Sequence, residues 1–441
     1  MNAVPGVPEE PQEPQEPEAR FEMGTGFEVS AALRPALTRA VERAGAGLEA
    51  LILSGSHATG EAVWTSFEGR AVSLSDVDLY AVVRSEPARG SSAQAGRLAP
   101  LASARERREW GLLAPVEVAF VTLAGLAHMP ARPGTVELAR SGRVVAGERG
   151  VLARLPRWEP AAIDAEERLL LLENRAFELL WADAVWPANG SGPRPAAEGA
   201  GTLARLRARH AVLKTALELA AARTLAHGEL PAGAAARVAR ARELGRPADA
   251  PTWLAGAWED LEPLWEEALG WRRGGARLVS DEVQAASWRA VTRAWCVAWW
   301  AERRGAAAEA WDRWDPWQAA LGNAARGSLA RRLRRSLAPL PGVSATPGAL
   351  ERLRRASAGT PANRIHGSAA VLLLAAAHAA QDAQDAQDTQ GQAQPRLPAG
   401  ALRALRALGV TRAERFATAA RETLVAWDRQ LHAGERTAEL A

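Results

Sequence analysis

Acidic residues and a Gly-Ser pair stand at the ends of short apolar runs in the first third of this 441-residue chain. Asp76 and Asp78 begin one run, Glu117 lies at the start of another, and Gly55-Ser56 follows a third. Two carboxylates at i and i+2 on a strand point to the same face, and a third from a neighbouring strand can converge on them. Such carboxylates repel one another unless a cation lies between them, and hard oxygen ligands of this kind suit magnesium.

The Gly-Ser pair adds a second kind of chemistry. Glycine permits close approach of a ligand, and the backbone N–H groups after Gly55-Ser56 can hold phosphate oxygens. Together with the three acids, this predicts metal-assisted nucleotidyl transfer with two magnesium ions. One ion would help to deprotonate an acceptor hydroxyl, and the other would neutralise charge on the leaving pyrophosphate.

The elements around these residues alternate between helix and strand. Apolar spacing and turn residues predict helices over 31–46 and 93–112, strands over 48–53, 76–83 and 116–121, and a hairpin within 63–72 that turns at Glu68-Gly69. This alternation is typical of a mixed α/β domain. We therefore expect a small mixed β-sheet that carries the acids on its strand ends.

After Pro160 the helical period dominates, and strand-like alternation is scarce. The predicted fold class is α+β. A disordered Pro/Glu-rich tail covers residues 1–24, a catalytic domain covers 25–155, and an all-helical domain covers 156–441. Flexible loops are expected near 187–201 and 380–397, where Pro/Gly-rich and Gln-Asp-Ala stretches have little to bury.

The motifs resemble those of the DNA polymerase β-like nucleotidyltransferase superfamily, in particular its small bacterial members, which include antibiotic-modifying enzymes. The matching segments are LILSGSHATGE, SLSDVDLYAVV and PVEVAF, followed by a closing element over 134–148 in which a short helix precedes a strand. The resemblance covers roughly residues 30–150. It departs from compact members because 21 positions separate Gly55 from Asp76, and because Glu117 stands where many relatives have Asp.

The resemblance implies roles for individual residues. Gly55, Ser56 and Ser75 would bind the triphosphate of the nucleotide, while Asp76 and Asp78 would hold magnesium. Glu117 would complete the metal site and assist the acceptor hydroxyl.

The expected activity is transfer of a nucleoside monophosphate, AMP from ATP, to a hydroxyl group with release of pyrophosphate. The acceptor would be a small molecule, or else a protein or tRNA. Two alternatives stay open: a regulator that binds nucleotide without turnover, and an antitoxin-like protein that adenylylates a partner protein.

Several side chains outside the motifs each allow two interpretations of their role. Lys214, the single lysine among 54 basic residues, either meets the triphosphate from a helix of the second domain or is an ordinary partly exposed lysine. Arg207 and His210 share its helical face and could assist it. His57 either touches phosphate or has no role, and the stretch 173–175 (Glu-Asn-Arg) is either a solvated face or the source of a base.

Composition excludes several classes of protein. The net charge of +3 gives no strong signal for nucleic acid, and one cysteine, Cys296, excludes a disulfide scaffold and a thiolate zinc site. No apolar run is long enough to span a membrane, so a cytoplasmic protein is expected. Eleven of the 17 tryptophans lie between 251 and 320, where their helical spacing favours a core over a surface for stacking bases.

Overall fold

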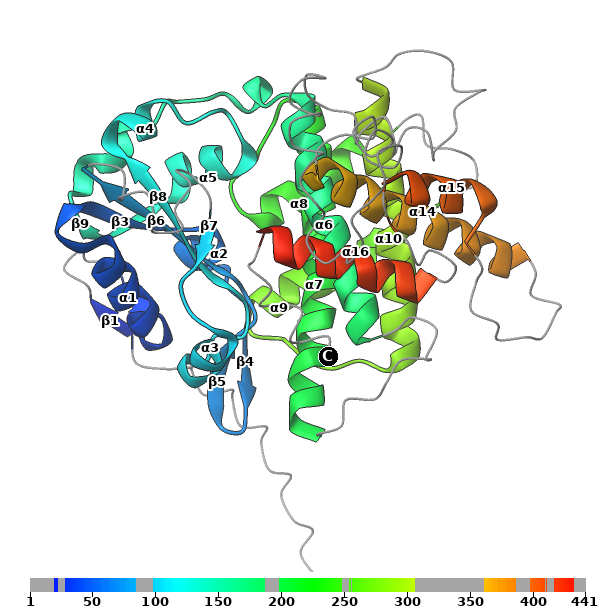
Figure 1. Ribbon diagram of the computed structural model, residues 1–441, viewed down its shortest axis with the longest axis horizontal. Helices are drawn as coiled ribbons and strands as arrows, with labels where there is room; N and C mark the ends of the chain where they lie inside the picture. Colours follow the sequence, from blue (N-terminus) through cyan, green and yellow to red (C-terminus); the bar gives the residue numbers. More distant parts are fainter. Residues whose placement is uncertain are drawn as a thin grey trace, which may run out of the picture.

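The computed structural model describes residues 20–22, 28–84, 98–186, 198–247, 254, 256–305, 361–385, 397–408, 410 and 416–431. Figure 1 shows an α/β part beside a part made of long helices. The elements of the α/β part are β1 (Arg20–Glu22), β2 (Glu28–Ser30), α1 (Arg34–Ala44), β3 (Leu48–Ser54), α2 (Gly55–Thr59), β4 (Trp64–Phe67), β5 (Arg70–Ser73), β6 (Val77–Val83), β7 (Leu98–Pro100), α3 (Ala104–Trp110), β8 (Val116–Thr122), α4 (Leu123–Ala127), α5 (Pro133–Ser141) and β9 (Arg143–Gly147).

A five-stranded sheet in the order β7-β8-β6-β3-β9 forms the centre of the α/β part. Strands β6 and β8 are parallel and the other neighbours are antiparallel, so the expected mixed sheet is confirmed. Side chains alternate across the sheet. Leu51 and Leu53 share a core with Leu37 of α1, whereas Ile52 packs with Leu126 and Leu138 of α4 and α5. Helices therefore cover both faces, and the polar strand ends are left at the edge.

The hairpin expected within 63–72 is confirmed as β4 and β5, which pair from Trp64 opposite Ser73 to Phe67 opposite Arg70. Its turn residues Glu68 and Gly69 both have positive φ, 51° and 72°, as two-residue hairpin turns require. Val72 of this hairpin is buried in the core of the helical part. The extra length between Gly55 and Asp76 thus contributes to the junction between the two parts.

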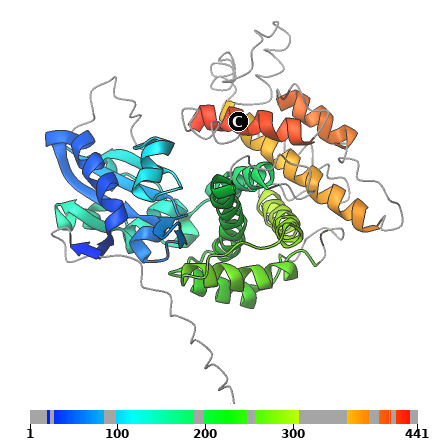
Figure 2. The same ribbon diagram turned by 90° about the horizontal axis from the view of Figure 1, so that it is seen from below.

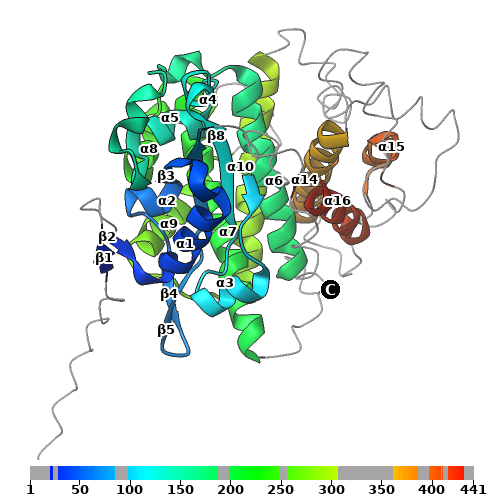
Figure 3. The ribbon, with the colours of Figure 1, turned by 60° about the vertical axis from the view of Figure 1, so that its left-hand side comes forward.

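The helical part contains α6 (Ala165–Val185), α7 (Glu198–Ala226), α8 (Ala234–Leu244), α9 (Glu262–Arg272), α10 (Asp281–Gly305), α14 (Pro361–Asp385), α15 (Ala399–Leu408) and α16 (Phe416–Leu431). Helix α7 contacts α6, α8, α9 and α10, while α14 packs on α6 and α10. Figures 2 and 3 show α14, α15 and α16 grouped along one flank of the other long helices. A mixed sheet followed by a helical half confirms the α+β class.

The described tryptophans of the helical part belong to its core, as their spacing predicts. Those buried within 256–305 are Trp258, Trp265, Trp271, Trp288, Trp295, Trp299 and Trp300, and Trp181 and Trp186 at the end of α6 are buried as well. The rings of Trp295 and Trp299 are stacked with centroids 5.9 Å apart, and Cys296 between them is fully buried. Trp311 and Trp314 lie outside the described residues.

Several boundaries differ from the sequence-based expectations. The helix expected over 93–112 is wrong in its first half, because Leu98–Pro100 forms edge strand β7 and α3 begins only after the Ser103 capping box. Three residues of the expected tail form β1, paired with β2. Helices α7 and α14 extend into the two expected loops, over 198–201 and 380–385. Apart from Leu397, which is buried, the remaining residues of the tail and of these loops lie outside the described residues.

Candidate active site

The acids meet at one edge of the central sheet. Ser54, Asp78 and Glu117 lie opposite one another on the neighbouring strands β3, β6 and β8. Asp76 stands two residues before Asp78, at the entrance to β6. The register therefore brings the sequence-predicted acids together.

Gly55 lies at the same edge, where β3 ends and α2 begins. Its φ is +67°, and a Cβ atom at this position would stand 3.3 Å from Oδ2 of Asp78. A side chain at Gly55 would thus be strained by its backbone and would crowd the carboxylate. The glycine leaves the backbone of the Gly55-Ser56 turn directly beside the acids.

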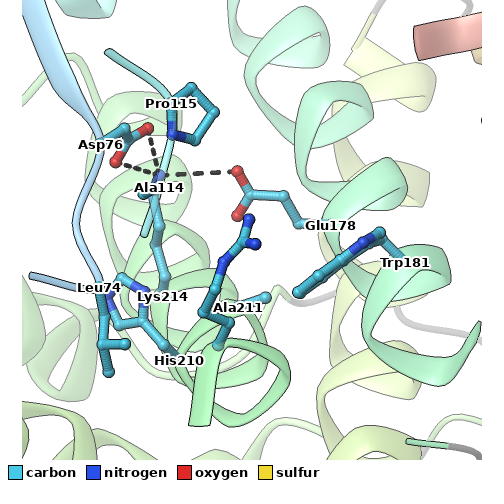
Figure 4. A pocket seen from close by; sticks show the side chains of 10 residues that line it. Leu74, Asp76, Ala114, Pro115, Glu178, Trp181, His210, Ala211 and Lys214 are labelled. Carbon is cyan, nitrogen blue, oxygen red and sulfur yellow. Dashed lines mark hydrogen bonds and ion pairs between the residues drawn. The ribbon is translucent and has the colours of Figure 1, made fainter. Parts of the chain in front are cut away.

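Lys214 of α7 reaches across the junction to the first of these acids. Its Nζ donates to both carboxylate oxygens of Asp76, at 3.0 and 2.9 Å, and lies 3.6 Å from Oε1 of Glu178 on α6 (Figure 4). The three side chains line one cleft, together with Leu74, Ala114, Pro115, Trp181, Arg207, His210 and Ala211. Arg207 and His210 thus share a face with Lys214, as expected.

The electrostatics of the acids are unequal. Burial tends to raise the pKa of Asp76, but the Lys214 ammonium outweighs it and holds this pKa far below its usual range. Burial, with the charges of Asp76 and Glu117, raises the pKa of Asp78 to about 8. The cations that act on Asp76 and Asp78 are Lys214 and Arg175, and both belong to the helical part of the molecule.

A magnesium ion fits the donor chemistry of these residues. The pKa of Asp78 is raised first by burial and then by the charges of Asp76 and Glu117, and a divalent cation would offset the repulsion among these carboxylates. Among the described residues, no group of three or more His, Cys, Asp or Glu side chains already stands in a metal-binding arrangement. In this structure the cation facing Asp76 is the Lys214 ammonium.

Ser75 and His57 make hydrogen bonds within the segment that leads into Asp76. Ser75 is buried, and its hydroxyl accepts a hydrogen bond of 2.9 Å from the backbone N–H of Val63. His57 Nε2 lies 3.3 Å from the Ser73 hydroxyl and 3.4 Å from the Ser75 carbonyl oxygen. Burial lowers the pKa of His57 to about 4, so its ring is neutral near pH 7. Neither Ser75 nor His57 lines the cleft.

Glu173 lies neither on a solvated helix face nor in the cleft, the two positions that the sequence left open. Its side chain is only 1% exposed and lies 3.4 Å from Nδ1 of His366, inside the helical part, so the solvated face is wrong. Five residues later Glu178 does line the cleft, where Arg175 donates to it at 2.6 Å. Five residues turn a helix by about 140°. The carboxylate of α6 that lines the cleft is therefore on a different face of the helix from Glu173.

Sequence reasoning missed Glu178 and Trp181. The ring of Trp181 forms a wall of the cleft, and the Arg207 guanidinium lies 4.9 Å from its centroid. Both residues lie within an amphipathic helix, whose pattern gives no sign of which polar or aromatic positions face a second domain. The position of α6 against the sheet supplies that information.

Glu61 fixes the two parts to each other beside the cleft. Its carboxylate accepts from the backbone N–H of Ala234 at 2.9 Å and from Arg272 at 2.7 Å. Arg140 of α5 donates to the carbonyl oxygen of Leu230 at 2.6 Å. These contacts join α5 and the segment after α2 to α9, to the start of α8 and to the connection between α7 and α8.

Comparisons with known proteins supply no identity: no family model matches the chain, and no curated protein matches it significantly. Within the part of the chain that the structure describes, no helix has the length and apolar character needed to cross a bilayer. The residues of the cleft themselves are the basis for a functional conclusion.

Proposed function

We propose that this chain is a magnesium-dependent nucleotidyltransferase, which moves a nucleoside monophosphate, AMP from ATP, to a hydroxyl group and releases pyrophosphate. The observation that favours this most is the row of Asp78 and Glu117 on parallel strands, with Asp76 at the strand entrance and a side-chain-free Gly55 turn against it. A row of acids beside an open backbone turn is suited to a metal-bound triphosphate.

The acids would hold the metal and handle the proton. Magnesium, when bound, would lower the pKa of the acceptor hydroxyl and neutralise charge on the triphosphate. The acceptor oxygen forms a bond to the α-phosphorus, and the bond from that phosphorus to the oxygen bridging to the β-phosphate breaks. Glu117 takes the hydroxyl proton, and pyrophosphate leaves with the electron pair of the broken bond.

The residues that would bind the triphosphate come from both parts of the molecule. The backbone of Gly55-Ser56 lies beside Asp78, and the Lys214 ammonium is a compact charge able to move between oxygens. The cleft between Asp76 and Trp181 gives the reactants a place between the sheet and α6. Of the three acids, Asp76 lines this cleft, while Asp78 and Glu117 follow it along the edge of the sheet.

The test uses the full chain, magnesium and nucleoside triphosphates labelled at the α-phosphate, with a panel of hydroxyl-bearing small molecules, RNA and proteins. We expect magnesium-dependent pyrophosphate release that matches transfer of label to an acceptor. Nucleotide binding without release or transfer would favour the non-catalytic regulator. Label transferred only to a protein would favour the antitoxin-like alternative.

A further inference from the structure

The Lys214 ammonium lies between carboxylates on opposite walls of the cleft. It contacts both oxygens of Asp76 at 3.0 and 2.9 Å and stands 3.6 Å from Oε1 of Glu178, as Figure 4 shows. The side chains of Lys214 and Glu178 are only 19% and 17% exposed, so water competes little for these contacts. The lysine is therefore held by one acid and within reach of a second.

The contact with Asp76 uses the oxygens that a metal ion would need. Two cations about 3 Å apart repel strongly in a partly buried site. The ammonium and a divalent cation are thus alternative occupants of the Asp76 carboxylate. Resting on the proposed function, we infer that metal loading transfers Lys214 from Asp76 to Glu178, and that Glu178 is a positioning residue for this lysine.

Glu178 is suited to receive the ammonium. Arg175, one helical turn earlier on α6, donates to its Oε1 at 2.6 Å and so fixes the carboxylate before the lysine arrives. The flexible four-carbon stem of lysine needs only a small rotation to close the 3.6 Å separation. The transfer keeps the charge at the mouth of the cleft, where it can meet an incoming phosphate.

The same geometry explains why a lysine stands here. An ammonium is a compact charge that can exchange oxygen partners by rotating its stem, whereas a guanidinium forms a planar fork that favours one partner. Lys214 is the single lysine of a chain with 54 lysines and arginines in total. Transfer between Asp76 and Glu178 is a task for which arginine is a poor substitute.

The single lysine also makes the transfer directly observable. Full-length protein produced with lysine carrying ¹³C at Cε gives one lysine signal, without other lysines to overlap it. On titration with MgCl₂ we expect this signal to shift along a saturable curve, with the midpoint at which the protein binds metal. In Glu178→Gln, the loaded signal should narrow toward that of a mobile side chain, because the second anchor is gone. Asp183→Asn, which removes a charge from the same helix outside the cleft lining, should behave as wild type.

Metal binding gives an independent readout that does not use activity. Binding of Mn²⁺ without nucleotide, followed by the electron paramagnetic resonance of the free ion, should be about tenfold tighter in Lys214→Met, since the competing cation is removed. Arg207→Met removes a charge from the same cleft without touching Asp76 and should leave Mn²⁺ affinity within about twofold of wild type.

The outcomes separate the inference from the proposed function. A lysine signal that stays fixed throughout the MgCl₂ titration, in wild-type protein that binds Mn²⁺ in the separate assay, overturns the inference alone. Unchanged or weaker Mn²⁺ binding by folded Lys214→Met does the same. If Lys214→Met does not fold, the labelled wild-type titration decides. Absence of any Mn²⁺ binding, with or without a nucleoside triphosphate, overturns both proposals.

Discussion

Acidic residues are balanced in different ways in the two parts of the molecule. In the helical part, Glu267 pairs with the fully buried Arg209, and both oxygens of Glu302 accept from Arg168. In the α/β part, Asp78 faces other acids, and burial beside them raises its pKa to about 8. The helical part thus neutralises its acids with its own arginines, whereas the sheet accumulates them at one edge.

The charges that oppose the sheet acids belong to the other part. Lys214 comes from α7 and Arg175 from α6, and both lower the pKa of Asp76. Ion pairs within one part stabilise that part, but a crowded acid edge stabilises nothing unless a further cation arrives. The helical pairs therefore stabilise the fold, whereas under the proposed function the acid edge would bind a metal ion.

The largest expected effect is on activity at the acid edge. Asp76→Asn should lower magnesium-dependent pyrophosphate release by at least about a thousandfold, because it removes a ligand charge with little change in volume. Its thermal unfolding should shift little, since the amide still accepts from Lys214 and the repulsion on Asp78 is relieved. Activity and melting temperature are measured on the same preparation. A fully active variant would refute the assignment of Asp76.

Disruption of an ion pair in the helical part should lower stability and leave activity unchanged. Glu267→Ala leaves the buried Arg209 guanidinium without its carboxylate, which should cost about 3 kcal/mol of unfolding free energy in urea titrations. Activity at low temperature should be retained, because neither residue lines the cleft. Glu229→Ala, from the more exposed pair with Arg240, is the control and should change stability little. Equal losses in both variants would contradict the distinction.

The sequence predicts the strands that carry the acids better than it predicts which residues of the helical part face them. Apolar runs that end in Gly-Ser or begin with acids predict β3, β6 and β8, because buried strands leave a local pattern. The short strand β7 is missed, since three residues ending in Pro100 have no such pattern and an edge strand tolerates proline. Glu178 is missed because its importance arises only when α6 packs against the sheet.

The acid edge should also reduce the stability of the metal-free protein at high pH. The folded protein keeps a proton on Asp78 up to about pH 8, whereas the unfolded carboxyl loses it near pH 4. Because the folded state binds more protons between these values, stability should fall as the pH rises from about 4 to about 8.

Asp78→Asn should remove this decline, since the amide carries no charge. We expect the variant to be more stable than wild type by a few kcal/mol at pH 8 in EDTA, and the gain to disappear near pH 4. Thermal unfolding across this pH range measures both. A variant less stable than wild type at pH 8 would contradict the raised pKa of Asp78.

Ser75 provides the test with the smallest expected effect. The sequence motif implies that Ser75 binds the nucleotide, whereas its hydroxyl contacts the backbone of Val63 in the structure. Removal of its hydroxyl leaves the buried N–H of Val63 without its acceptor, so Ser75→Ala should cost about 1 kcal/mol of stability. If the hydroxyl only positions the chain before Asp76, KM for ATP should stay within about twofold of wild type. A KM that rises tenfold while stability is unchanged would instead make Ser75 a nucleotide ligand, as the motif implies. Ser66→Ala, at an exposed position of β4, should change neither quantity.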